Sequence, residues 1–110
     1  MNKRLSPKDI PNLIKLIAYS EGLAELLYQD KKITTEVYSK VKNLILSLGR
    51  LNKKGLNNTF IRYISAHELK ALDELITLTE QLIETGQREH KVSVAYIEKW
   101  RQLVNEFKMH

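Results

Sequence analysis

Apolar residues recur three and four positions apart along most of this chain, which is the period of an α-helix. In the last such stretch, Trp100 shares a stripe with Ile97, Val104 and Phe107, so we expect it to be largely buried. The first stretch is the most apolar, which is typical of a helix that contacts two or three others. The pattern predicts helices over residues 7–29, 35–53, 66–85 and 94–108.

Polar residues before these stretches carry helix-start signals. Ser65 and Glu68 have the spacing of a capping box, in which each side chain bonds the other residue's backbone amide. Thr34 and Ser93 stand at equivalent places before their helices, and Ser6 precedes a proline in the first turn. Gly55 and Gly86 fall where the second and third helices are expected to stop.

Residues 56–64 fit two conformations. The apolar positions suit a short helix over 57–64, capped by Asn57 or Asn58, whereas the β-branched and aromatic content suits a strand. A lone strand would have no partner in an otherwise helical chain, so we favour the helix. We see no internal repeat and no low-complexity tract. The expected fold is all-α: a single-domain four-helix bundle over residues 1–110, with an additional short helix between its second and third helices.

Composition narrows the class of protein. With 110 residues, 43% of them apolar, the chain has room for one domain with a real core. It has no cysteine, which excludes disulfides and thiol chemistry and fits a reducing compartment, so we expect a cytoplasmic protein. No apolar run approaches the roughly 18 residues that span a bilayer, so we expect no membrane partner.

The net charge of +5 is unevenly distributed. Residues 37–67 hold six basic side chains and no acidic one, whereas residues 68–90 are acidic on balance. Lys40, Asn43, Ser47, Arg50 and Lys54 step by three and four along one polar face of the second helix. Lysine and arginine neutralise phosphates and release counterions, so this face predicts contact with a nucleic-acid backbone.

The following residues would extend that face. Asparagine side chains would add hydrogen-bond donors to phosphates, and Tyr63 or Phe60 would stack on an unpaired base. The first hypothesis is therefore a non-catalytic nucleic-acid-binding accessory protein that uses the second helix and the 50–62 loop. The expected nucleic-acid contacts are Lys40, Arg50, Lys53, Lys54, Asn57, Asn58 and Arg62.

A run of charge is also typical of a solvated face that merely keeps a protein soluble. The second hypothesis is a protein-binding adaptor, inhibitor or immunity-type protein that acts through an exposed helical face, in one version as a homodimer. The acidic stripe of Asp73, Thr77, Glu80 and Glu84 would then face the basic stripe of a second protomer. Alternatively, this stripe faces the second helix of its own chain.

Catalytic constellations are hard to find. His67 and Glu68 begin like the zinc-protease helix motif, but Ala71 stands where the second histidine is needed. The glycines lack the spacing of a phosphate-binding loop, and no Glu-x-x-His pair of a di-iron bundle occurs. We therefore expect no enzyme, no catalytic residues, no metal, no cofactor and no small-molecule substrate.

Overall fold

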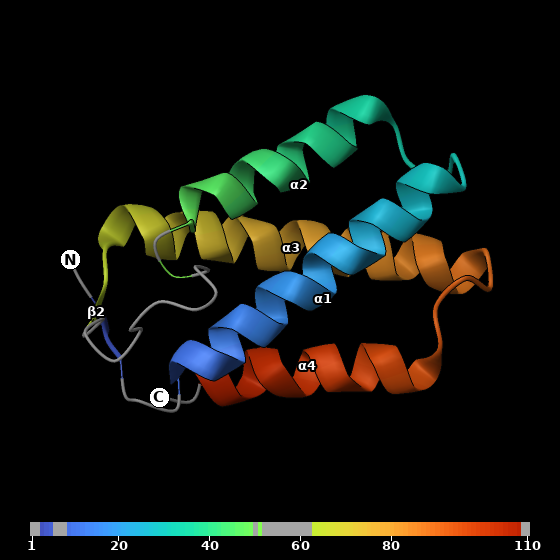
Figure 1. Cartoon of the computed structure of the whole chain (residues 1–110). Helices are drawn as coiled ribbons and strands as arrows, with labels where there is room; N and C mark the ends of the chain where they lie inside the picture. Colours follow the sequence, from blue (N-terminus) through green and yellow to red (C-terminus); the bar gives the residue numbers. More distant parts are fainter. Residues whose placement is uncertain (1–2, 6–8, 50, 52–62, 109–110) are drawn as a thin grey trace.

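A computed structural model describes residues 3–5, 9–49, 51 and 63–108 of the chain (Figure 1). Helices dominate this part, which confirms the all-α class. Two short strands accompany them. The elements are β1 (Lys3–Arg4), α1 (Asp9–Gln29), α2 (Thr35–Ser47), β2 (Tyr63–Ile64), α3 (Ala66–Arg88) and α4 (Val94–Lys108).

The helices alternate in direction along the chain. In Figure 1, α1 and α3 run from left to right, and α2 and α4 return. The turns 30–34 and 89–93 therefore lie together at one end, here called the turn end. β1 and β2 lie at the other end with the starts of α1 and α3, here called the ribbon end. α1 contacts all three other helices, and α3 also packs against α2, so the two long helices form the centre of the molecule.

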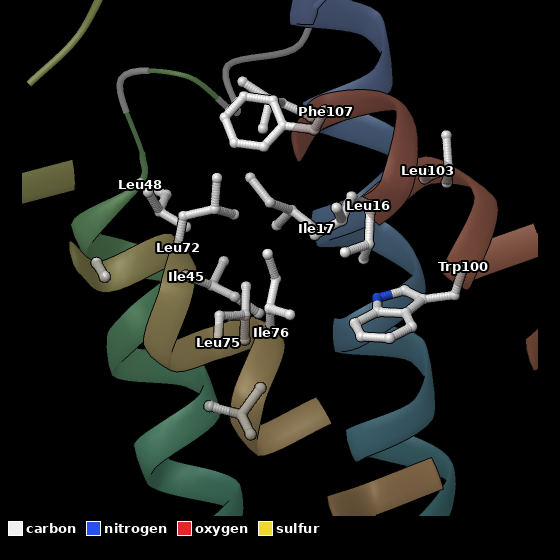
Figure 2. Close-up of a cluster of buried hydrophobic side chains, with 14 of the residues drawn as sticks. Leu16, Ile17, Ile45, Leu48, Leu72, Leu75, Ile76, Trp100, Leu103 and Phe107 are labelled. Atoms are coloured by element: carbon white, nitrogen blue, oxygen red, sulfur yellow. The ribbon is translucent and has the colours of Figure 1, made fainter. Parts of the chain in front are cut away.

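Leucine and isoleucine from all four helices fill the core between them (Figure 2). Trp100 is 1% exposed, and Ile97, Val104 and Phe107 are buried beside it on α4, as predicted. The indole Nε1–H of Trp100 donates a hydrogen bond to Ser20 Oγ of α1 at 3.0 Å. The bond satisfies the polar atom of the indole, so the ring can be fully buried without an unpaired donor.

The predicted helix starts are confirmed at three positions. Ser65 Oγ accepts from the Glu68 backbone N–H at 3.1 Å, and Glu68 Oε1 accepts from the Ser65 N–H at 3.0 Å, which completes the capping box. Thr34 accepts from the Val37 N–H in the same way, and Ser93 accepts from the Tyr96 N–H. The Ser6 cap lies outside the described residues.

Replacing Ser65 with alanine is expected to lower the free energy of unfolding by about 1 kcal/mol, because the Glu68 amide at the start of α3 loses its side-chain acceptor. Urea unfolding followed by circular dichroism measures the change. Ser39→Ala is the control, since Ser39 is exposed inside α2 and the change there is expected to be neutral or slightly stabilising. Equal effects of the two substitutions would contradict the role given to the cap.

The predicted end of the second helix is wrong. α2 ends at Ser47 rather than at residue 53, and Gly55, the predicted stop, lies outside the described residues. After Ser47 the backbone makes tight i→i+3 bonds, including one from the Leu51 N–H to the Leu48 carbonyl. Leu48 and Leu51 are both fully buried. In such a turn, residues three apart lie on the same side, so Leu48 and Leu51 can both be buried. The same spacing also occurs in an α-helix, which is why the sequence pattern predicted that the second helix continues here.

The third helix also departs from prediction. α3 continues through Gly86 to Arg88, and the residue in the left-handed conformation after it is His90, with φ of 54°. Lys31 has φ of 58° after α1. In both turns, backbone bonds from the next residue close the helix end: Lys32 N–H to Leu27 O at 2.8 Å and Lys91 N–H to Gly86 O at 2.9 Å. These are Schellman motifs made without glycine.

Tyr63 and Ile64 belong to a strand, which corrects the predicted short helix over 57–64 at its last two residues. Residues 57–62 of that helix lie outside the described residues. β2 pairs antiparallel with β1, so the strand has the partner that the sequence seemed to lack. The pairing joins two segments about sixty residues apart, and no local pattern reports so distant a contact.

Candidate nucleic-acid interface

Of the seven residues predicted to contact nucleic acid, Lys40 lies in the described part of the chain. It is exposed on α2, and the exposed Asn43 and Ser47 follow it on the same helix at the predicted spacing. Ser47 Oγ donates to the Asn43 carbonyl at 3.2 Å. The start of the predicted polar face is therefore confirmed as a solvent-facing stripe. The other six, Arg50, Lys53, Lys54, Asn57, Asn58 and Arg62, lie outside the described residues.

Lys42 belongs to a different surface. Its Nζ donates to Glu21 Oε2 at 2.8 Å and to Glu25 Oε1 at 3.4 Å, and it lies 5.8 Å from the centre of the Tyr38 ring. The hydrogen bond to the Glu21 carboxylate raises the pKa of Lys42 above its ordinary value. Lys42 thus connects α2 to α1 and is not available to a phosphate without giving up two carboxylates.

The acidic stripe of α3 is partly engaged as well. Arg101 of α4 lies 3.5 Å from Glu80, so this ion pair links α3 to α4. With Lys42 bound to α1, neither of these two ion pairs joins α2 to α3, although the two helices pack against each other. Asp73 and Glu84 are exposed on the outer face of α3.

The ribbon end supplies an aromatic and a cationic side chain that face solvent together. Arg4 and Tyr63 are directly opposite each other in the β1–β2 pair, which places their side chains on the same face of the ribbon. Arg4 is exposed, and Tyr63 is 48% exposed. We did not predict Arg4 as a site residue, because only the strand pairing brings it to Tyr63.

The acidic residues at the start of each long helix are buried rather than exposed. Asp9 of α1 is 2% exposed, and Glu68 of α3 is 7% exposed within its capping box. Lys70, two residues after Glu68 on α3, is exposed. The ribbon end also bounds the basic 52–62 segment, since Leu51 precedes it and Tyr63 follows it. The exposed acids Asp73 and Glu74 begin one turn later.

A shallow pocket of about 380 Å³ lies elsewhere, between α1 and the turn that joins α3 to α4. Its ionisable side chains are already engaged: the Tyr96 hydroxyl donates to the Tyr19 carbonyl, and Lys91 lies 3.5 Å from Asp30. Burial raises the pKa of Tyr96 to about 12, so this phenol stays protonated at neutral pH. The lining gives no nucleophile with an adjacent base.

Among the described residues, no three histidine or carboxylate side chains gather into a group that could hold a metal ion. His67 lies exposed in the first turn of α3, and His90 lies exposed in the turn after it. None of the helices that the structure describes has the length and apolar character to cross a membrane.

The chain matches no protein-family model, no curated protein and no solved structure.

Proposed function

We propose that this protein is a single-domain four-helix bundle that works in the cytoplasm as a non-catalytic nucleic-acid-binding accessory protein. The observation that carries the proposal is the ribbon end, where Arg4, Tyr63 and Lys70 are exposed while Asp9 and Glu68 are buried. The acid-free stretch of residues 37–67 joins this end to the outer face of α2. A surface of one charge with an aromatic side chain is what binding to a phosphate backbone with exposed bases requires.

Two kinds of contact make up the proposed interface. Lys40, Arg50, Lys53, Lys54 and Arg62 neutralise phosphates, and Asn57 and Asn58 donate hydrogen bonds to phosphate or sugar oxygens. Tyr63 stacks on an unpaired base, with Arg4 beside it for the neighbouring phosphate. Stacking of this kind needs a base that is not held in a duplex, so single-stranded nucleic acid is the favoured form.

Titration of labelled single-stranded oligonucleotides, read by fluorescence anisotropy at two salt concentrations, tests the proposal. Removing one phosphate contact, as in Lys40→Gln or Lys53→Gln, is expected to reduce the salt slope by nearly one unit and to weaken binding to every sequence alike. Lys99→Gln is the matched control: Lys99 is an exposed lysine on α4, so the net charge changes equally. The control is expected to leave the salt slope unchanged.

The stacking contact has its own signature. Tyr63→Ala is expected to weaken binding by about 1–3 kcal/mol, whereas Tyr63→Phe keeps the ring and is expected to retain most of the affinity. Arg50→Lys is expected to weaken binding more than Lys53→Arg, because a guanidinium binds phosphate through two hydrogen bonds or stacks on a base. Circular dichroism of each variant shows that the helices are intact.

A protein-binding adaptor or inhibitor, alone or as a homodimer, is the second candidate. The observation that favours it is a row of small and apolar residues on α1, Ala18, Gly22 and Leu26, that are exposed. Dissociation constants weaker than about 10⁻⁴ M for every nucleic acid at physiological salt would exclude the first proposal and leave this one.

A further inference from the structure

We infer that the chain is an internal duplication: residues 3–51 and 62–110 are two copies of one helix hairpin, assembled around a pseudo-twofold axis. Adding 59 to a residue number in the first copy gives its counterpart in the second. The shift carries α1 onto residues 68–88 and α2 onto residues 94–106. The observed α3 and α4 agree with these ranges to within two residues at every boundary. The inference goes beyond the proposed function and does not depend on it.

The ion pairs at the turn end have the symmetry of a dimer. Lys32 of the first turn lies 3.0 Å from Glu89 of the second, and Lys91 of the second lies 3.5 Å from Asp30 of the first. The shift of 59 converts one pair into the other, because Asp30 corresponds to Glu89 and Lys32 to Lys91. Reciprocal contacts of this form are what a twofold axis between two identical subunits produces.

The same axis passes through the ribbon end. Arg4 pairs with Tyr63, and these two residues are themselves 59 apart. When two equivalent residues of two copies pair with each other in an antiparallel ribbon, the twofold axis that relates the copies passes between them. The axis therefore runs along the molecule, from between β1 and β2 at the left of Figure 1 to between the two turns at the right.

An ion pair inside each copy corresponds as well, although α1 packs against α2 more extensively than α3 packs against α4. Glu21 of α1 binds Lys42 of α2 at 2.8 Å, and their counterparts Glu80 and Arg101 lie 3.5 Å apart. Both helix ends use a left-handed residue, Lys31 in the first copy and its counterpart His90 in the second.

Buried positions along α1 and α3 agree in residue class. Two kinds of polar residue also recur at matching buried places: a carboxylate at the start of the helix and a hydroxyl in its middle. The matching buried pairs are Asp9 and Glu68, Leu13 and Leu72, Leu16 and Leu75, Ile17 and Ile76, Ser20 and Thr79, and Leu23 and Leu82.

The packing explains why both copies are needed. α1 packs against α4 of the other copy, and α3 packs against α2 of the other copy, so each hairpin covers the long helix of its partner. A single hairpin would leave that apolar face in water, which makes a pair of hairpins the smallest unit with a closed core. Residues 52–61 belong to neither copy and serve as the covalent link between them.

We saw no internal repeat in the sequence, and the duplication inferred here differs from that interpretation. Most matched residues are similar rather than identical, as with Ile33 and Val92 or Thr34 and Ser93, so no run of shared letters marks the repeat. The contacts reveal the repeat, because an ion pair or a buried apolar pair needs only the same class of residue at the same position.

Reversing the order of the two copies tests the inference with residues 3–110 of the chain. The permuted protein consists of residues 62–110, then 52–61 as the link, then 3–51. In the natural chain the link joins residue 51 to residue 62, and in the permuted chain it joins their counterparts, residue 110 and residue 3. It is expected to be a helical monomer that unfolds within about 5 °C of the wild-type midpoint. A second version carries a longer glycine–serine link. Loss of the helical circular dichroism, or association, in both versions overturns the inference.

A turn exchange provides a second measure that keeps the natural order of the chain. Residues 30, 31 and 34 are exchanged with residues 89, 90 and 93, while Ile33 and Val92 stay in place. Equivalent hairpins accept each other's turns, so the midpoint is expected to remain within about 5 °C of wild type. A fall of more than about 10 °C shows that the turns are not equivalent and overturns the inference.

Discussion

Trp100→Ala is expected to lower the free energy of unfolding by about 3–5 kcal/mol, the largest effect of any single substitution described here. The side chain is 1% exposed and lies between α4 and α1 (Figure 2), so alanine leaves a cavity that the surrounding helices cannot fill by small shifts. Ser20 also loses the indole donor to its Oγ. Urea unfolding measures the change, and a loss below about 1 kcal/mol would contradict the burial.

Two variants separate packing from hydrogen bonding at this position. Ser20→Ala keeps the indole but leaves its buried Nε1–H without an acceptor, which is expected to lower the free energy of unfolding by about 1–3 kcal/mol. Trp100→Phe keeps part of the ring volume and removes the donor, so its loss is expected to be smaller than that of alanine. In the wild-type protein, a tryptophan emission maximum at the wavelength of a fully solvated indole would disagree with all three expectations.

The burial of Trp100 could be predicted because it rests on a local pattern. Ile97, Val104 and Phe107 lie at helical spacing from Trp100 within one helix, so the four side chains share one face. That face is buried as soon as any other helix packs against it. The starts of α2, α3 and α4 were predictable for the same reason, since a cap and the amides it bonds lie within three residues.

Features that depend on distant residues could not be predicted in this way. The end of α3 was placed at Gly86, yet His90 holds the left-handed position, and the ion pairs of this turn reach the other hairpin. The strand at Tyr63 depends on β1, which lies about sixty residues earlier in the sequence. Secondary structure of two residues has no periodicity to detect.

In the candidate interface too, local features could be predicted and features that depend on distant residues could not. The stripe from Lys40 to Ser47 follows from helical spacing, and the exposure of its described residues is confirmed. Lys42 counted toward the basic stretch by its charge alone, but Glu21 and Glu25 of another helix bind it. Arg4 was overlooked because its position beside Tyr63 exists only after the strands pair.

Gly86→Ala is expected to be destabilising, although alanine is the better helix former. A Cβ at this position would lie 2.5 Å from Val92 Cγ2, which is closer than side-chain carbons approach, and 3.3 Å from Val92 Cβ, which is a tight contact. Valine is stiff about χ1 and cannot swing aside cheaply. Overpacking costs about 1–3 kcal/mol, against a gain of about 1 kcal/mol in helix propensity, so a net loss of about 1–2 kcal/mol is expected.

Gly22→Ala is the matched control, since both glycines lie inside long helices. A Cβ at Gly22 would meet the Tyr96 hydroxyl oxygen at 3.4 Å, an ordinary contact distance. Alanine is therefore expected to raise the free energy of unfolding there, by up to about 1 kcal/mol. The loss of backbone freedom is the same at both glycines. A stability change of opposite sign at the two positions would therefore show that the space around the new Cβ decides the effect.

Removing the obstacle is expected to reverse the sign at Gly86. In a Val92→Ala background the Cγ2 methyl at 2.5 Å from the new Cβ is absent and only the residue 92 Cβ at 3.3 Å remains, so Gly86→Ala is expected to stabilise the protein by up to about 1 kcal/mol, as at Gly22. The double-mutant cycle measures the coupling between the two positions directly. Additive effects would show that Val92 is not what requires the glycine. Coupling with a change of sign identifies the contact between α3 and the turn that follows it as the reason Gly86 lies inside the helix rather than at its end.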